Sequence, residues 1–572
     1  MSSKPTNILD QTLLTCKSAF RFMLLFSFAT NILLLAMPLY SMQVFNRVIS
    51  SGSMETLIML SLLAIAGFLT LGLMQAARSM ALIKISEWLD NKLSPHFLYN
   101  TISISAMNSS PLGSQSLRDL TTLRQFLTGS AINALLDAPW AIIYIVVIFI
   151  IHPMNGYVAI SGGVLLLCFA VLNEYATKET LGSANELSIK SMSYVDTATR
   201  NAEVVEAMGM MPAILKAWQK VNRQVIGEQT LASNRATIIS GFSKVVRMIL
   251  QIAVTGLGAY YVLRNELSTG GIIASSILIG RALAPFETAI ETWKSVISAR
   301  KSYSRLKQML ELPYNRNDAM SLPAPEGNLS VEKVVFAPQN SQKPTLKGIN
   351  FAIDAGDVLG IIGPSAAGKS TLAKLLVGIW KPASGHVRLD GADVFSWNRN
   401  EFGQYVGYLP QDVELFPGTV KENIARMQED ASPEAIVDAA KMANVHDLIL
   451  HLPNGYETQI GPGGSILSAG QRQRVGLARA FFGDPRLVVL DEPNANLDEA
   501  GERALLQTLL NAKTRKITTL IISHRPAILQ AVDKILYLND GVVAGFGPRN
   551  DVIAQLNQQT AQVRQLATST AK

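Results

Sequence analysis

Eight consecutive residues in the second half of the chain have the types and the spacing that bind phosphate groups. They read Gly363-Pro364-Ser365-Ala366-Ala367-Gly368-Lys369-Ser370, the full G-x-x-x-x-G-K-[ST] pattern. The glycines let backbone N–H groups turn toward phosphate oxygens, Lys369 can reach the β- and γ-phosphates, and the Ser370 hydroxyl can hold Mg²⁺. An apolar run at 358–362 precedes the loop, and a helical stretch that begins at Thr371 follows it. This context favours a phosphate site over a glycine-rich turn without function.

Two acidic residues follow a second apolar run. The run Leu487–Leu490 indicates a buried strand, and Asp491 and Glu492 come at its end. Asp491 is expected to hold Mg²⁺, directly or through water. Glu492 can orient and deprotonate an attacking water, as a general base does. The alternative, an acidic strand end that is merely exposed to solvent, is less favoured because the phosphate loop lies in the same domain.

A third motif lies before the acidic strand and reads Leu467-Ser468-Ala469-Gly470-Gln471-Arg472-Gln473-Arg474. It resembles the signature motif of ATP-binding-cassette (ABC) ATPases, a match far more specific than a phosphate loop alone. Ser468 and the N–H groups after it are expected at a helix N-terminus, where an anion binds readily. In the family this site contacts the γ-phosphate bound to the other subunit, so the resemblance implies two cassettes.

Three further residues take their expected roles from the same resemblance. Gln411 matches the glutamine that touches Mg²⁺, Asp498 matches the loop that crosses the dimer interface, and His524 matches the histidine that contacts the γ-phosphate. The resemblance implies an ATPase that uses ATP and Mg²⁺. The expected catalytic residues are Glu492, His524 and Gln411, the metal ligands are Ser370, Gln411 and Asp491, and the nucleotide contacts are Gly363, Pro364, Ser365, Ala366, Ala367, Gly368, Lys369, Ser370, Thr371, Ser468, Gly470, Gln471 and Asp498.

One of the departures from the family pattern concerns recognition of the base. The aromatic residue that usually stacks on adenine would fall at Pro338, in the run Val335-Phe336-Ala337-Pro338. A proline ring offers no aromatic face to a base. Recognition of the base is therefore expected to depend on Phe336 or on other contacts.

The composition places these motifs in one part of a two-part chain. At 572 residues the chain is too long for one domain, and its composition is 48% hydrophobic and 16% charged, with the apolar residues concentrated in the first half. We expect an N-terminal cytoplasmic segment at 1–19, an α-helical transmembrane domain at 20–311, a linker at 312–328 and an α/β nucleotide-binding domain at 329–572. The formal net charge of +7 is attributed to Lys and Arg at a membrane surface, and no nucleic-acid partner is expected.

Uncharged runs predict six membrane-spanning helices, because a bilayer needs about 20 apolar residues per helix. The runs lie at 22–46, 56–77, 138–173 and 248–262, and a sixth, less apolar stretch lies at 269–293. The run 138–173 is too long for one span, and residues 152–156 are expected to break it into a helical hairpin. Basic residues gather in the segments 78–124 and 178–247. The positive-inside bias therefore places these segments, both termini and the phosphate loop in the cytoplasm.

Two charged residues fall deep in the predicted spans. Arg281 lies within the sixth span, and Asp137 reaches a comparable depth in the third. An ionisable residue at that depth rarely faces lipid, although a long arginine side chain can also snorkel toward the interface. The sharper hypothesis is that Arg281 faces a central path in a dimer and pairs there with Asp137 or with a substrate carboxylate.

Six spans followed by one cassette resemble an ABC exporter half-transporter along essentially the whole chain. Within that group, residues 135–140, 206–210 and 280–285 look like the inner-membrane ATPases of type I secretion systems, especially the kind that exports proteases and lipases with uncleaved C-terminal signals. The resemblance implies a homodimer, multi-pass in the lipid of a bacterial inner membrane, with its cassettes in the cytoplasm. It also implies a periplasmic membrane-fusion adaptor, an outer-membrane channel, and ATP-driven export of an unfolded secreted protein.

Two other functions stay open. The same architecture serves exporters or flippases of lipid, peptide or drug, which stimulation of the ATPase by lipid or drug, without protein secretion, would indicate. The other function is a non-pumping, ATP-gated regulator. Glu492 argues against a regulator, because non-pumping relatives often lose the catalytic acid.

Overall fold

The computed structural model describes residues 8–107, 115–311, 321–338, 341 and 343–558. The chain divides into two compact units, a helical one before residue 315 and a mixed α/β one after it. Residues 1–7 of the predicted N-terminal segment and 312–320 of the predicted linker lie outside the described residues. The predicted fold class, six spanning helices followed by an α/β ATPase domain, is confirmed.

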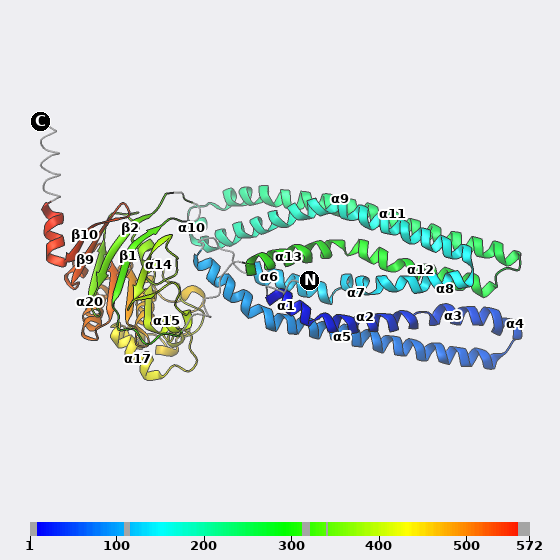
Figure 1. Ribbon diagram of the computed structural model, residues 1–572, viewed down its shortest axis with the longest axis horizontal. Coiled ribbons are helices and arrows are strands. Elements are labelled where there is room, and N and C mark those ends of the chain that lie inside the picture. The colour runs from blue at the N-terminus through cyan, green and yellow to red at the C-terminus, as the bar shows by residue number, and fades with distance from the viewer. Residues whose placement is uncertain (1–7, 108–114, 312–320, 339–340, 342, 559–572) are drawn as a thin grey trace, which may run out of the picture. The chain divides into compact units, whose positions relative to one another are not determined.

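The helical unit is built from long, roughly aligned helices (Figure 1). Its elements are α1 (Ile8–Thr15), α2 (Lys17–Leu33), α3 (Ala36–Gln43), a π-helical turn η1 (Val44–Val48), α4 (Ile49–Ser51), α5 (Met54–Met107), α6 (Gln115–Thr128), α7 (Ser130–Asp137), η2 (Ala138–Trp140), α8 (Ala141–Ile151), α9 (Pro153–Arg200), α10 (Ala202–Ala207), α11 (Met211–Leu263), α12 (Thr269–Glu291) and α13 (Trp293–Glu311).

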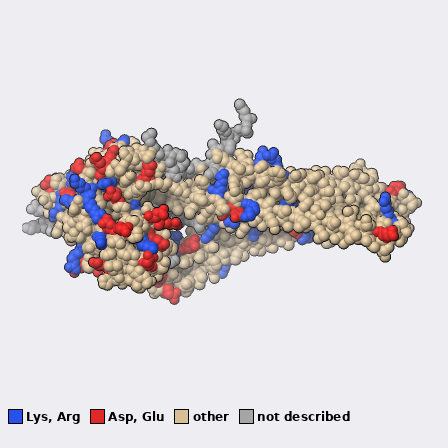
Figure 2. Space-filling model, turned by 90° about the horizontal axis from the view of Figure 1, so that it is seen from below, with Lys and Arg blue, Asp and Glu red and all other residues tan. Residues whose placement is uncertain are grey.

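Six helical stretches in the described part of the chain are long and apolar enough to cross a bilayer: 17–51, 54–107, 130–151, 153–200, 211–263 and 269–291. On the face shown in Figure 2, much of the helical unit's length carries few charged side chains. The predicted hairpin break is confirmed and is sharper than expected. Only His152, with an extended backbone, separates α8 from α9, and Pro153 starts α9 at a position where a helix needs no N–H donor.

Three helices continue far beyond the length of a span. The helices α5, α9 and α11 contain 54, 48 and 53 residues. At 1.5 Å per residue each is about 70–80 Å long, against a hydrocarbon core of about 30 Å. The basic residues of the segments 178–200 and 211–247 therefore lie on the same continuous helices as the spans that they adjoin.

A buried carboxylate ties α6 to α13. The Asp119 side chain is only 4% exposed and accepts hydrogen bonds from Arg305 Nε (2.8 Å) and Nη2 (2.6 Å) and from Ser302 Oγ (3.0 Å). A buried charge is tolerated when it is paired and hydrogen-bonded in this way. The segment after the second span is therefore held to the helix that continues from the sixth.

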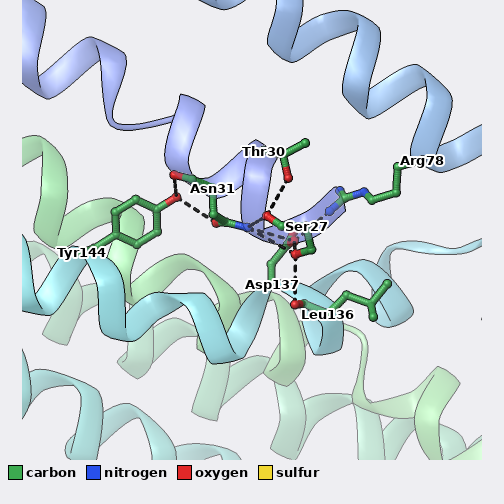
Figure 3. A network of polar contacts seen from close by, with 7 residues as sticks. All are labelled: Ser27, Thr30, Asn31, Arg78, Leu136, Asp137 and Tyr144. Atoms are coloured by element: carbon green, nitrogen blue, oxygen red, sulfur yellow. Dashed lines mark hydrogen bonds and ion pairs between the residues drawn. The ribbon is translucent and has the colours of Figure 1, made fainter. Parts of the chain in front are cut away.

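A second polar network lies within the spans and joins α2, α5 and α7 (Figure 3). Asp137 Oδ1 accepts hydrogen bonds from Ser27 Oγ, from Arg78 Nη1 at 2.7 Å and from Asn31 Nδ2 at 3.2 Å. The Tyr144 hydroxyl donates to Asn31 Oδ1 at 2.8 Å. Asp137 thus has Arg78 as its ion-pair partner, and the hypothesis that it pairs with Arg281 is wrong for this structure.

The α/β unit contains two sheets. Its strands are β1 (Leu329–Phe336), β2 (Leu346–Ile353), β3 (Val358–Ile362), β4 (Ser384–Leu389), β5 (Ala392–Asp393), β6 (Val406–Leu409), β7 (Leu487–Asp491), β8 (Thr518–Ile522), β9 (Lys534–Asn539) and β10 (Val542–Pro548). The smaller sheet is antiparallel in the order β2-β1-β4-β5, and the larger has the order β10-β9-β3-β8-β7-β6. The pairs formed by β9, β3, β8, β7 and β6 are parallel.

Helices cover the parallel sheet because its central strands are apolar on both faces. Every residue of β7 and β8, and all but the last of β3, is buried. The helical elements are α14 (Lys369–Leu376), α15 (Arg399–Tyr405), α16 (Val420–Ile424), α17 (Pro433–Met442), α18 (His446–Leu450), η3 (Gly455–Glu457), η4 (Pro462–Gly464), α19 (Ala469–Phe481), α20 (Glu499–Thr514) and η5 (Ile528–Gln530).

Candidate active site

The predicted chemical residues converge because they follow adjacent parallel strands. The phosphate loop follows β3, and His524 follows β8. Asp491 is the last residue of β7, Glu492 comes directly after it, and Gln411 follows β6. The carboxyl ends of parallel strands meet at one edge of the sheet, which is where open α/β folds bind ligands. The motifs, which span more than 160 residues of sequence, therefore occupy one site.

The phosphate loop has the backbone that its glycines predict. Gly363 has φ 155°, and a Cβ there would collide with the carbonyl oxygen of Leu538. Gly368 caps α14 with φ 97°, a conformation that side chains rarely adopt. The helix then begins at Lys369, two residues before the predicted start at Thr371. The loop is thus turned directly into a helix N-terminus, where N–H groups favour an anion.

Lys369 lies folded into its own loop. Its side-chain Nζ donates to the carbonyl oxygens of Gly363 and Pro364, both at 2.9 Å, and the residue is only 7% exposed. Burial lowers the pKa of Lys369, although the charges of Glu492 and Asp491 act in the opposite direction. An incoming phosphate would supply the anionic partner that this ammonium lacks in the loop.

The candidate metal ligands lie together. Ser370 Oγ donates to Asp491 Oδ1 at 3.2 Å, and Asp491 is 2% exposed. Burial raises the pKa of Asp491, and the hydrogen bond from Ser370 partly offsets that effect. No cluster of three or more His, Cys, Asp or Glu residues that could hold a metal occurs in the described ranges. A hydroxyl, one carboxylate and the Gln411 amide oxygen fit Mg²⁺, which is commonly bound by one or two carboxylates together with substrate phosphates.

Glu492 is held in an unusual backbone conformation beside these ligands. Its φ is 49°, a left-handed value that costs a non-glycine residue on the order of 1–3 kcal/mol and is concentrated at functional sites. Its Oε2 accepts from Gln411 Nε2 at 3.1 Å, and its Oε1 lies 4.0 Å from His524 Nε2. The three predicted catalytic side chains are therefore neighbours, with Glu492 in the middle.

Gln473 was not predicted to have a role, and the structure gives it a positioning one. This residue of α19 is 2% exposed, donates from Nε2 to the Glu492 carbonyl at 3.1 Å, and accepts from the Asn496 N–H at 3.2 Å. It therefore anchors the strained segment that carries Glu492. Gln473 lies inside the signature motif, two residues after Gln471. Its place in that motif was the sequence feature that could have indicated a role for it.

The signature residues form a second group, at the start of α19. Ser468 Oγ accepts from the Gln471 N–H at 3.2 Å while Gln471 Oε1 accepts from the Ser468 N–H at 2.8 Å, a capping box at a helix N-terminus. Asp498 caps α20 and binds Arg474 Nη2 at 2.9 Å. Among the described residues, no hydrogen bond or ion pair joins Ser468, Gly470 or Gln471 to the loop 363–370. Within one chain, the phosphate loop, the metal ligands and the catalytic side chains thus lie together. Ser468, Gly470 and Gln471, which we call the signature end, make no hydrogen bond or ion pair with that loop among the described residues.

The region expected to recognise the base contains an internal aromatic pair. The rings of Phe336 and Trp380 stack with centroids 4.9 Å apart and planes 9° apart, and Lys374 Nζ lies 4.5 Å from the Trp380 centroid. Pro338 is exposed. One face of Phe336 is thus already occupied by Trp380, which leaves this ring less surface for stacking on a base.

Discrimination between adenine and guanine is expected to be weak. Without an aromatic ring at Pro338, we predict that GTP supports hydrolysis within about tenfold of ATP, or about 1.4 kcal/mol of discrimination. Steady-state hydrolysis of the two nucleotides by the purified full-length protein checks this. Pro338→Tyr is expected to strengthen binding of both nucleotides, because a stacked ring is indifferent to base edges. A preference for ATP far above tenfold in the unaltered protein would show that another residue reads the base.

Known proteins resemble this chain along nearly its whole length. Residues 20–284 match the family "ABC transporter transmembrane region", and residues 346–495 match "ABC transporter". The "Type I secretion system ATP-binding protein PrsD" of Rhizobium meliloti (strain 1021) is 42% identical over 554 residues, which cover 96% of this chain and 95% of that protein. The "Leukotoxin translocation ATP-binding protein LktB" of Mannheimia glucosida is 27% identical over 550 residues, 95% of this chain and 77% of that protein.

Solved structures also share this fold, and one of them matches nearly the whole chain. It is a bacterial Atm1-family ABC exporter with ATP bound, which matches with a TM-score of 0.80 and covers 96% of both chains at 21% sequence identity. At that identity the likeness concerns the fold alone. It agrees with the order of helical unit and α/β unit described above.

Proposed function

Because this chain belongs to the ABC transporter family, we propose that it is the membrane-spanning ATPase of a type I secretion system and exports unfolded polypeptide. The observation that carries this proposal is the 42% identity to a type I secretion ATP-binding protein over nearly all of both chains. The resemblance therefore includes the spans through which a substrate would pass as well as the ATPase unit. The proximity of Glu492 to Gln411 and His524 supports ATP hydrolysis at this site.

Each group in the site has a proposed part in hydrolysis. The loop 363–371 binds the phosphates through its backbone N–H groups, and Lys369 neutralises their charge. Ser370, Asp491 and the Gln411 amide oxygen would hold Mg²⁺, which when bound would supply positive charge beside the phosphates. Glu492 accepts a proton from the water that attacks the γ-phosphate, while His524 donates a hydrogen bond to that phosphate.

The signature end supports a homodimer as the working form. It has a capped helix N-terminus, a favourable anion site, yet it does not contact the phosphate loop of its own chain. A second copy related by two-fold symmetry would present Ser468, Gly470 and Gln471 to the nucleotide of the first. ATP binding would then close two cassettes around two nucleotides, and hydrolysis would open them.

The proposed setting is the inner membrane of a bacterium, with the ATPase unit in the cytoplasm. The basic segments 78–124 and 178–247 support that orientation through the positive-inside bias. A periplasmic membrane-fusion adaptor and an outer-membrane channel would continue the path. The substrate would be an unfolded protein with a C-terminal signal, since the path has to admit an extended chain.

Co-expression with an adaptor, an outer-membrane channel and a candidate substrate tests the function. We expect secretion to require Glu492, the substrate's C-terminal signal and both partner proteins. A fast-folding, stable domain fused to the substrate should block secretion, because folding competes with export. If the reconstituted protein instead flips lipid at rates that match its ATPase, and no secreted protein changes that ATPase, the lipid flippase is the correct function.

A further inference from the structure

Arg281 occupies an isolated position on the sixth span. Along α12 it is the only exposed residue between Gly270 and Ile290. It lies 12 residues from the first residue of the helix and 10 from the last, or about 18 Å and 15 Å along the axis. It is therefore close to the middle of the span, where snorkelling toward either interface is least effective.

The nearby acidic side chains are already engaged. Asp137 pairs with Arg78 at 2.7 Å, Glu287 with Arg247 at 2.8 Å, and Glu291 with Lys244 at 2.7 Å. No hydrogen bond or ion pair from another described residue reaches Arg281. These three acidic residues thus have partners within the protein, and the Arg281 guanidinium has none among the described residues.

The space beside Arg281 is open. A Cβ built on Gly280 would meet no atom within 4 Å, and the next residue on this side of the helix, Ala284, is small. Tyr144, at the edge of the buried network of Figure 3, lies on α8, and α8 packs against the helix α12 that carries Arg281. Arg281 is thus an exposed residue on a helix that packs beside the helix of Tyr144.

An unpaired guanidinium in open space at mid-span requires an anionic partner or water. Lipid chains are an expensive environment for it, and intramembrane charges generally face a protein interior or a water-filled path. Lipid phosphates lie at the interface, far from this depth. A second copy of the chain would add another Arg281, and its Asp137 would be paired with its own Arg78, so that aspartate would not neutralise the charge.

We propose that Arg281 binds carboxylate side chains of the polypeptide in transit. This inference rests on the proposed export of polypeptide and names the chemistry that the path recognises. A guanidinium can form two parallel hydrogen bonds to one carboxylate, a geometry that a lysine ammonium lacks. Arg281 would then favour substrates that contain Asp and Glu. Because binding at this one site would be transient, the polypeptide could continue through the path.

The test compares matched peptides on the full-length protein reconstituted in lipid. The probes are unstructured peptides of one length and sequence that carry Glu, Gln or Lys at the same positions. The half-saturating concentration for stimulation of the ATPase is measured for each peptide. In the unaltered protein we expect the Glu peptide to act at a concentration lower than the Gln peptide by about tenfold, the scale of a charge-assisted hydrogen bond.

Substitutions at Arg281 should change selectivity. Arg281→Gln is expected to raise the half-saturating concentration of the Glu peptide about tenfold and to change that of the Gln peptide less than about twofold. Arg281→Glu should shift the preference toward the Lys peptide, and Arg281→Lys should keep part of the preference for Glu. The control is Arg223→Gln, an exposed arginine of α11 with no partner among the described residues, which should leave both basal and stimulated ATPase unchanged.

Two results would overturn the inference in different ways. If peptides stimulate the unaltered protein but Arg281→Gln shifts the Glu and Gln peptides equally, or shifts neither, Arg281 does not bind carboxylates although polypeptide export stands. If no peptide stimulates the unaltered protein while lipid does, the proposed function fails and this inference fails with it.

Discussion

Replacement of Glu492 by Gln is expected to reduce steady-state ATP hydrolysis by a factor of about 100 or more, the scale of a lost general base. Gln has nearly the shape of Glu, and its amide oxygen can still accept the 3.1 Å hydrogen bond from Gln411. Two hydrogen bonds hold the strained backbone at Glu492. Gln473 Nε2 donates to the Glu492 carbonyl, and the Glu492 N–H donates to the Ile522 carbonyl. The substitution therefore removes the proton acceptor and leaves its surroundings in place.

MgATP binding should survive Glu492→Gln, so the protein should accumulate as a nucleotide-bound, closed dimer. Nucleotide binding, hydrolysis rate and oligomeric state measured on one preparation check all parts of this expectation. Glu499→Gln is the matched control, because Glu499 is an exposed acid in the first turn of α20 near the site. Hydrolysis close to normal in Glu492→Gln would show that another group accepts the proton.

Replacement of Lys369 by Ala is expected to weaken MgATP binding itself, by about 100-fold. Hydrogen bonds to charged groups contribute about 1.5–3 kcal/mol each, and the phosphates would lose the one ammonium buried in their loop. Equilibrium binding of MgATP measures the effect, with Lys441→Ala on α17 as the control. Equal affinity in Lys369→Ala would mean that the backbone N–H groups alone bind the phosphates.

The same lysine predicts how ATP affinity depends on pH. Burial lowers the pKa of Lys369, so its ammonium loses a proton at a lower pH than an exposed lysine does. The phosphates bind the charged form, and affinity should therefore be highest below this pKa and fall as the pH rises through it. Lys369→Ala should abolish that part of the pH dependence. If the decline persists in the variant, it comes from another group.

Local patterns predicted the features that depend on neighbouring residues. The phosphate loop, the acids after β7 and the break at His152 each depend on backbone geometry or apolar character within about ten residues, and all three are in the expected places. Gln411 and His524 were predicted from the family resemblance, and the structure places them with Glu492 at the carboxyl edge of the parallel sheet. Periodicity and turn residues are sufficient for conclusions of this kind.

Contacts between distant segments could not be predicted in this way. The pairing of Asp137 with Arg78 depends on how α5 packs against α7, across 59 residues of sequence. The stacking of Phe336 on Trp380 and the anchoring of Glu492 by Gln473 likewise depend on tertiary packing. The charge and depth of Asp137 indicated that it needed a cationic partner. The sequence did not show which arginine would lie beside it, because that depends on helix packing.

The length of the helices has a mechanical consequence. If it moves as one body, a helix such as α9, with 48 residues and about 72 Å of length, displaces one end by about 6 Å when it tilts by about 5° around the other. That displacement exceeds the roughly 5 Å spacing between neighbouring β-strands. A lever that multiplies displacement divides force in the same proportion. Long helices that tilt in this way can open a gap for an extended chain with a small angular change. The force at their moving ends is correspondingly small, so they are poorly suited to unfold a folded domain.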